Sequence, residues 1–485
     1  MPKKKTTTNG AGGAGIRIRM YRVGFGDFFL VTLATAKGEQ HIVIDCGVFK
    51  GTSGTGDIGS IEAAIANLAK VTRRELALVI MTHRHADHIA GFGRFAEEFR
   101  RFKVGAVWMP IWEEEYGEAK KLQAEVTALA EEVQAHLDRR LAATGETDHE
   151  LYHRVGNVTG IEPAAAAARK PNGKAGRTSM NAVALDLLKT GWSVKPQYLK
   201  TNDTPVLPPA LAAAGLTARV LGPPPIEDTK LVKLMDLKKH VGQYIALSEA
   251  GARDSGRWEP FSGAWYDDAA GSYPTEAFLE WMPKRGDELT LDNVAHVLDE
   301  ARARMEGALK PPPRNALEMA AKALDSFLNN QSLVVLFTYR GKNLLFVGDA
   351  QAGNWEHWLY DTDEPDKAPT GPLARRAQDI LGSVDVYKVG HHGSTNATPI
   401  VVSQHIREGA VALCSTQRGV YGHDDTAVPL ERLMAALDKR CTVVRSDQVA
   451  VKVDGGTIAP QVKRALKKPD GGKLQPGELW VDYLL

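Results

Sequence analysis

Three histidines and one aspartate lie within residues 83–88 of the chain. Imidazole nitrogens and carboxylate oxygens are costly to bury without partners, but together they form the ligand set of a divalent transition metal. His83 and His85 are two residues apart, so their rings can point the same way from an extended segment, whereas Asp87 and His88 follow the bend. The spacing therefore predicts two metal ions. The alternative is a surface histidine cluster after a core strand.

Residues of the same chemical types also stand at the ends of other predicted strands. The apolar run 76–81 leads into the histidine segment and predicts a buried strand. Asp349 ends an apolar strand at a glycine, where a carboxylate can supply an oxygen ligand that bridges two ions. The adjacent His391 and His392 end a further predicted strand, 383–389.

The composition is that of a soluble globular protein. With 43% hydrophobic and 25% charged residues the chain can build a full core, and 485 residues are enough for one large domain with insertions. No apolar run approaches the ~20 residues of a membrane span, and no signal peptide is expected. The net charge of +1 gives no general attraction to nucleic acid. Three scattered cysteines predict reduced thiols and a cytoplasmic location: Cys46, Cys414 and Cys441.

Strand and helix patterns alternate in both halves of the chain, which predicts an α/β fold of two packed sheets flanked by helices. Ser60 is expected to cap one helix and Ser179 another, and residues 333–347 are expected to form a hairpin. The expected organisation is a disordered basic tail (1–15), a first core half (16–111), a helical insertion (112–195), a return strand (196–224), an aromatic-rich insertion (225–314), a second core half (315–455) and a C-terminal extension (456–485).

The two insertions have different patterns. In the first, apolar residues recur at helical spacing from Leu122 to Leu137, and the intervening charges predict a solvated face. In the second, aromatic residues form either the small core of the insertion or a surface that stacks on a substrate. These residues are Trp258, Phe261, Trp265, Tyr266, Tyr273, Phe278 and Trp281. Two basic clusters, Lys3-Lys4-Lys5 and residues 463–468, are interpreted as solvated tails.

Several motifs together resemble the metallo-β-lactamase superfamily, whose His-x-His-x-Asp-His signature is matched by residues 83–88. Within it they resemble the hydrolase domain of the bacterial DNA-uptake protein ComEC and its soluble relatives, which include phosphorylcholine esterases. The resemblance covers residues 16–110 and 316–455. Besides the histidine segment, the motifs are Gly24-Phe25-Gly26-Asp27, Leu221-Gly222-Pro223, Asn329-Asn330, Ser332-Leu333-Val334, Gly348-Asp349, His391-His392-Gly393-Ser394 and Tyr421-Gly422-His423.

The resemblance implies an αββα sandwich of two mixed sheets and a hydrolase with two divalent metal ions, Zn²⁺ or Mn²⁺. A hydroxide shared between ions ~3.5–4 Å apart would be the nucleophile. Asp45 is expected to orient a ligand histidine from behind, or else to cap a turn. The implied metal ligands are His83, His85, Asp87, His88, Asp349 and His392. The implied catalytic residues are Asp87, His391 and His423, and the implied substrate contacts are Asn330 and Ser394.

The sequence departs from the family pattern in two places. Most relatives place a ligand histidine before the bridging aspartate, but residues 329–332 offer no imidazole. We therefore expect His391 or His392 to complete the first site with His83 and His85, and favour His392. In the second place, Gly-His-Asp stands at 422–424 where relatives often have Gly-His-Pro. His423 then either completes the second site or donates a proton to the leaving group.

Three functions are compatible with these residues. A phosphodiester substrate such as DNA or RNA is favoured, because the most similar branch cleaves such bonds. The same metal site could instead attack a small carboxylic ester, a lactone or a β-lactam. The third interpretation is a non-catalytic, metal-stabilised module that binds a partner protein through the insertions.

Overall fold

The computed structural model describes residues 15–49, 59–144, 149–160, 179–228, 321, 324–360, 372–422, 427–448 and 472–485. Residues 229–314 of the predicted aromatic-rich insertion and the two basic clusters lie outside these residues. In the part that the structure describes, no helix is both long enough and apolar enough to cross a membrane.

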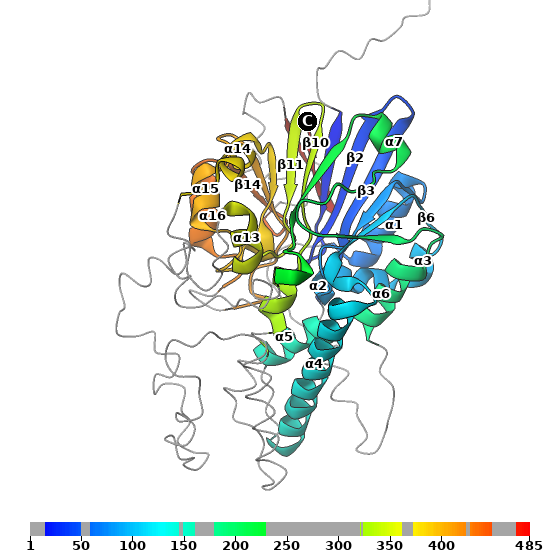
Figure 1. Cartoon of the computed structure of the whole chain (residues 1–485), viewed down its shortest axis with the longest axis vertical. Coiled ribbons are helices and arrows are strands. Elements are labelled where there is room, and N and C mark those ends of the chain that lie inside the picture. Colours follow the sequence, from blue (N-terminus) through cyan, green and yellow to red (C-terminus); the bar gives the residue numbers. More distant parts are fainter. Residues whose placement is uncertain are drawn as a thin grey trace, which may run out of the picture.

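A mixed sheet of eight strands forms one half of the core (Figure 1). Its first strands are antiparallel and its last four are parallel. From edge to edge they are β15 (Lys473–Pro476), β16 (Trp480–Leu484), β1 (Ile16–Tyr21), β2 (Phe28–Thr35), β3 (Gly38–Cys46), β5 (Leu78–Ile80), β7 (Val107–Pro110) and β8 (Pro196–Leu199).

A second mixed sheet of six strands forms the other half. The predicted hairpin is confirmed as the antiparallel pair β10–β11, and β11 to β14 run parallel. In order the strands are β14 (Thr442–Arg445), β13 (Val411–Cys414), β12 (Val386–Lys388), β11 (Lys342–Phe346), β10 (Val334–Tyr339) and β9 (Thr217–Gly222).

The predicted strand 76–81 is divided in the structure, and so is the segment that pairs with it. The run 76–81 contributes β4 (Glu75–Leu76) and β5, and the run 104–109 contributes β6 (Lys103–Val104) and β7. Strands β4 and β6 pair with each other in a separate ribbon. The division occurs where Gly105 packs on the backbone of Ala77, so closely that a Cβ atom would lie 2.7 Å from the Ala77 carbonyl oxygen.

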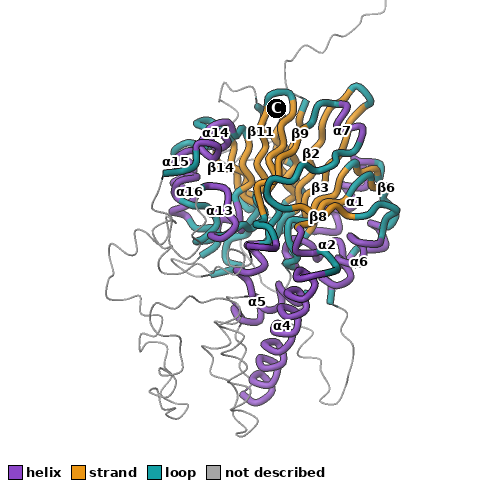
Figure 2. The backbone as a smooth tube through the Cα atoms, in the orientation of Figure 1, coloured by secondary structure: helices purple, strands orange, loops and turns teal. Residues whose placement is uncertain are grey.

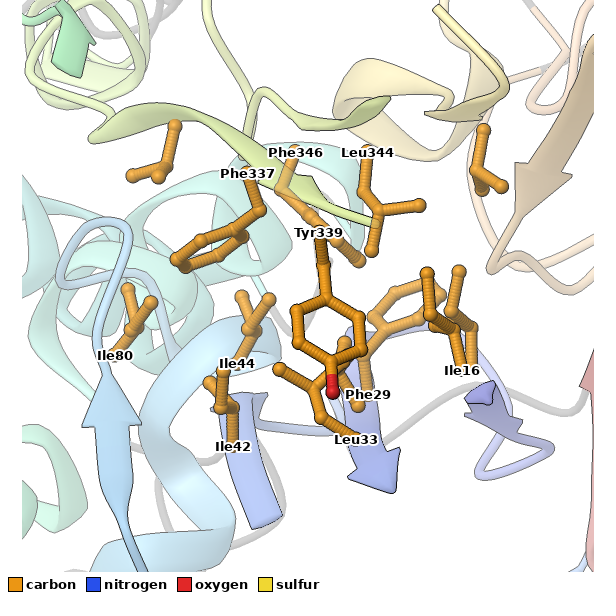
Figure 3. Packing of buried hydrophobic residues seen from close by; sticks show 14 of the residues in the cluster. Ile16, Phe29, Leu33, Ile42, Ile44, Ile80, Phe337, Tyr339, Leu344 and Phe346 are labelled. Atoms are coloured by element: carbon orange, nitrogen blue, oxygen red, sulfur yellow. The ribbon is translucent and has the colours of Figure 1, made fainter. Parts of the chain in front are cut away.

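The two sheets pack face to face through alternate residues of their strands. In β2, Phe29 and Val31 belong to the cluster between the sheets, whereas Phe28 and Leu30 face the other way. Figure 3 shows side chains of both sheets meeting in this layer, among them Ile44 from β3 and Phe337 from β10. Removing this apolar surface from water holds the sheets together.

Helices cover the outer face of each sheet (Figure 2). Ser60 and Ser179 cap α1 and α6 as predicted, because each hydroxyl accepts a backbone N–H from the first turn. The predicted αββα sandwich is therefore confirmed. The first sheet is covered by α1 (Ile61–Thr72), α2 (Ala86–Arg94), α3 (Ala96–Phe99) and α6 (Met180–Thr190), and the second by α13 (Ala352–Leu359), α14 (Arg375–Ser383), α15 (Ile400–His405) and α16 (Glu431–Asp438). A short helix, α7 (Pro209–Ala213), precedes β9.

Helices α4 (Gly117–Thr144) and α5 (His149–Thr159) project from one end of the sandwich (Figure 1). Their buried faces share a separate apolar cluster with Trp112 and with Phe327 of the helical segment 324–330. The first expected insertion is thus helical where it is described, and its core includes a segment from the second half of the chain.

The end of the chain belongs to the first sheet. We expected a C-terminal extension from residue 456, but β15 and β16 continue the sheet beside β1. The buried Arg19 of β1 makes two hydrogen bonds of 2.7 Å with Asp482 of β16. These two hydrogen bonds fix the register of the β1–β16 pair.

Candidate metal centre

The predicted ligands come together at the carboxyl ends of parallel strands. Asp45 lies at the end of β3, and residues 82–88 lead from β5 into α2. Asp349 follows β11, and His392 follows β12. The two sheets are joined here by a hydrogen bond of 2.9 Å from the Leu333 backbone N–H to the Thr82 carbonyl oxygen.

Close backbone contacts bring the other strand ends to the histidine segment. A Cβ atom on Gly47 would lie 2.2 Å from the His88 nitrogen, so only glycine permits this approach. The Asp27 N–H donates a 2.8 Å hydrogen bond to the Asp87 carbonyl oxygen. The glycine turn before Asp27 therefore brings its backbone against a neighbouring loop.

Four buried residues form the centre of the site. His88 Nε2 lies 3.1 Å from Asp349 Oδ2, and His392 Nε2 lies 3.2 Å from Asp87 Oδ2 and 3.6 Å from Asp349 Oδ2. One ligand atom from each of these four residues lies within 4.8 Å of the others, a spacing that could hold a metal ion. The Asp349 carboxylate faces both imidazoles.

His83 and His85 form a neighbouring pair. His83 Nε2 lies 3.0 Å from His85 Nδ1, and the His83 ring centre is 4.1 Å from that of His88. We expected His392 to join this pair, but the structure places it with Asp87 and His88. The left-handed backbone at His391 and His392 and the contact from His392 Nδ1 to the Ser415 carbonyl oxygen, 2.9 Å, direct the ring there.

The outward-facing ring nitrogens of His83 and His88 contact hydrogen-bonding partners. His88 Nδ1 lies 2.8 Å from Asp45 Oδ2, and His83 Nδ1 lies 3.2 Å from the Thr82 hydroxyl, which itself donates to Asp45. His85 Nε2 faces Asp325 Oδ1 at 3.9 Å. An outer nitrogen that donates its proton leaves the lone pair of the inner nitrogen free to bind a cation. These contacts turn the inner nitrogens of His83 and His88 toward the candidate site.

We predict that Asp45→Asn weakens metal binding roughly 10- to 100-fold. The asparagine amide can donate to His88 Nδ1, which would place the proton of that ring on the inner nitrogen. Titration of the metal-free protein against a competing chelator measures the change. The control is Asp186→Asn on the exposed face of α6. Equal affinities for the two variants would show that Asp45 does not orient a ligand.

Lys388 and Asp27 complete the buried charge network, and the sequence analysis assigned neither of them a role. Lys388 Nζ contacts Asp27 Oδ2 and lies 3.3 Å from Asp349 Oδ1. Burial alone would lower the pKa of Lys388, but Asp27 and Asp349 raise it above its usual value. The lysine is therefore charged. By contacting Oδ1 of Asp349, it leaves Oδ2 of the same carboxylate facing the histidines.

The histidines form two groups, one with lowered and one with raised pKa values. Burial lowers the pKa values of His83 and His85, so both rings are neutral, as metal ligands must be. Burial acts in the same direction on His88 and His392, but nearby carboxylates, Asp349 foremost, raise both pKa values. Protons on these two rings offset the carboxylate charge in the metal-free protein.

The donor set fits a divalent cation. Asp87 Oδ1, His88 Nε2 and Asp349 Oδ2 are buried and form no hydrogen bond within the protein. Such atoms are costly to bury unless something binds them. A second group, Asp27, Asp45 and His88, also meets the spacing for a metal. Lys388 contacts Asp27 Oδ2 of that group, whereas in the first group it contacts only Oδ1 of Asp349 and leaves Oδ2 without a hydrogen bond, so the first group is the better cation site.

The remaining predicted residues lie around the centre. His391 is half-buried, and its Nδ1 lies 2.8 Å from the Ser394 hydroxyl and 2.9 Å from Asn396 Oδ1. Asn330 is fully buried, and its amide oxygen accepts from the Asn354 N–H at 3.1 Å. This position supports the backbone rather than facing a substrate. His423 lies outside the described residues.

An open pocket lies beside the centre; its empty space, including space open to solvent, is about 440 Å³. Apolar side chains line one part of the pocket, and polar groups from α5 and the 324–330 helix line another. Its lining residues are Phe25, Phe49, Asp87, Arg154, Asn157, Asp325, His391, Ser394, Val420, Tyr421 and Val428. Sequence analysis identified three of them, Asp87, His391 and Ser394, as site residues.

Fold and site together define the class of protein. Two mixed sheets between helices, with a buried cluster of histidine and aspartate at one edge, support a metal-dependent hydrolase. Residues 21–156 match the family model of the metallo-beta-lactamase superfamily. No curated protein matches the chain in sequence.

Proposed function

We propose that this protein hydrolyses phosphodiesters with the help of two divalent metal ions, Zn²⁺ or Mn²⁺. The observation that carries the proposal is the position of Asp349 Oδ2, which faces both His88 and His392 beside the His83–His85 pair. The ComEC-like motifs favour a phosphodiester, because that branch cleaves such bonds.

Each ion would be bound by a different set of side chains. His83 Nε2 and His85 Nδ1 would bind one ion, and Asp87, His88 and His392 would bind the other. Asp349 would contact both. When bound, such ions activate water and stabilise negative charge that develops on the substrate. The network of Asp45, Ser415 and Lys388 keeps the ligands in place.

His391 is our candidate for moving a proton to the leaving group. It lines the pocket, and contacts with Ser394 and Asn396 fix its Nδ1. Its Nε2 is then the nitrogen that can exchange a proton with a substrate. Ser394 thus positions His391 in addition to lining the pocket.

The function can be tested with the purified protein and added Mn²⁺ or Zn²⁺. We expect cleavage of bis-p-nitrophenyl phosphate and of single-stranded DNA or RNA, and loss of cleavage with a chelator. Cleavage of lactones or carboxylic esters without cleavage of phosphodiesters would favour the alternative substrate class. Tight metal binding with no turnover of either class would instead indicate a non-catalytic module.

A further inference from the structure

Helix α5 of the insertion docks directly on the histidine segment. The Asn157 amide oxygen accepts a 3.0 Å hydrogen bond from the Asp87 N–H. From α6, the Asn181 amide donates to the Arg84 carbonyl oxygen at 2.9 Å and to the Asn157 carbonyl oxygen at 3.0 Å. The position of α5 is therefore fixed relative to the candidate metal ligands.

Arg154 is one turn before Asn157 on α5, so the two side chains share a helix face. Both line the pocket. The Arg154 side chain is 16% exposed, its Nη1 lies 3.8 Å from Asp325 Oδ2, and its guanidinium carbon lies 5.2 Å from the centre of the Tyr421 ring. An aromatic face and a carboxylate hold the cation at the pocket wall.

The apolar part of the lining suits a flat apolar group. Phe25, Val420 and Val428 form a small apolar cluster with Phe49 and Tyr421. The Phe25 and Tyr421 rings stack at 6.1 Å with an interplanar angle of 21°. Phe25 also contacts His392, with ring centres 4.4 Å apart, so this part of the lining reaches the metal centre.

The charged side chains of the lining are Arg154 and two carboxylates, of which Asp325 pairs with Arg154 and Asp87 belongs to the candidate metal centre. Arg154 is the only Lys or Arg side chain among the described residues that line the pocket. A guanidinium has five N–H donors in one plane, so it can contact Asp325 and a substrate oxygen at the same time. The matching ligand has an anionic oxygen beside an aromatic or other flat apolar substituent.

We propose that Arg154 binds a non-bridging anionic oxygen of the substrate and thereby selects anionic aromatic diesters over uncharged esters. The inference rests on the proposed function, and it names the substrate class of that site. It also gives the helical insertion a role, because α5 supplies a residue that touches the substrate.

Two non-hydrolysable ligands of similar shape distinguish the effect of ligand charge on binding from the effect of ligand shape. Diphenylphosphinate is an anion, and diphenyl sulfone is uncharged. Calorimetry on the metal-loaded protein measures their binding. We expect Arg154→Met to raise the Kd of diphenylphosphinate about 10- to 100-fold, because hydrogen bonds to charged groups contribute this much. The Kd of diphenyl sulfone should not change. Arg154→Lys should give an intermediate loss for the anion, since it keeps the charge but not the planar donors.

The matched control is Arg418→Met, which removes an exposed arginine paired with Glu431 outside the pocket lining. It should leave both ligands unaffected. Equal weakening of both ligands by Arg154→Met, or no weakening of either, overturns the inference. The proposed function has a separate test. If the protein binds the anion through Arg154 but cleaves no phosphodiester, the proposed function is contradicted, and the inference about Arg154 is not.

Discussion

Replacing Asp349 with asparagine is expected to abolish activity and to weaken binding of both metal ions. The carboxylate oxygen that faces His88 at 3.1 Å and His392 at 3.6 Å becomes part of a neutral amide. Metal ions contribute several kcal/mol of transition-state stabilisation, so kcat/KM should fall by about 10³-fold or more. Elemental analysis and phosphodiester assays on the same samples measure both effects.

The control for Asp349→Asn is Asp379→Asn, the same chemical change at an exposed position of α14. It should keep the metal content and activity of the unmodified protein. An Asp349→Asn variant with full activity and two bound ions would refute the assignment of this residue as the shared ligand.

Removing the buried lysine should have the second largest effect. We expect Lys388→Met to lower the free energy of unfolding by about 3–5 kcal/mol, because it leaves the buried Asp27 carboxylate without its cation. The two side chains are each only 2% exposed, so water cannot compensate for the loss. Chemical denaturation of the metal-free protein measures the change.

A second substitution, at Asp27, distinguishes the loss of charge compensation in Lys388→Met from the loss of side-chain packing. In the double variant Lys388→Met with Asp27→Asn, no uncompensated carboxylate of Asp27 remains, so much of the lost stability should return. If the double variant is less stable than Lys388→Met alone, or if Lys388→Met costs nothing, the ion pair does not have the structural role assigned to it.

Local patterns predicted most of the residues that meet at the candidate metal centre. The histidine spacing, the carboxylate at the end of β11 and the serine caps of α1 and α6 all depend on a few neighbouring residues. Their chemical types are restricted by burial or by hydrogen bonding, so the sequence shows them directly. The overall αββα arrangement followed from the alternation of strand and helix patterns in both halves.

Contacts between distant segments were harder to predict. Nothing near Asp27 in the sequence shows that Lys388 will face it across the two sheets. The grouping of His392 with Asp87 depends on a left-handed turn that the dipeptide His391-His392 does not specify. Arg154 was taken as part of a charged helical insertion, and only the docking of α5 on the histidine segment brings it to the pocket.

The central claim is that two separated parts of the chain together bind metal ions at one site. Anomalous scattering from crystals grown with Zn²⁺ tests it most directly. The account predicts two strong peaks, one beside His83 Nε2 and His85 Nδ1 and the other among Asp87, His88 and His392, with Asp349 next to both. Zinc peaks that are all remote from Asp349, or no peak at these histidines, would contradict it.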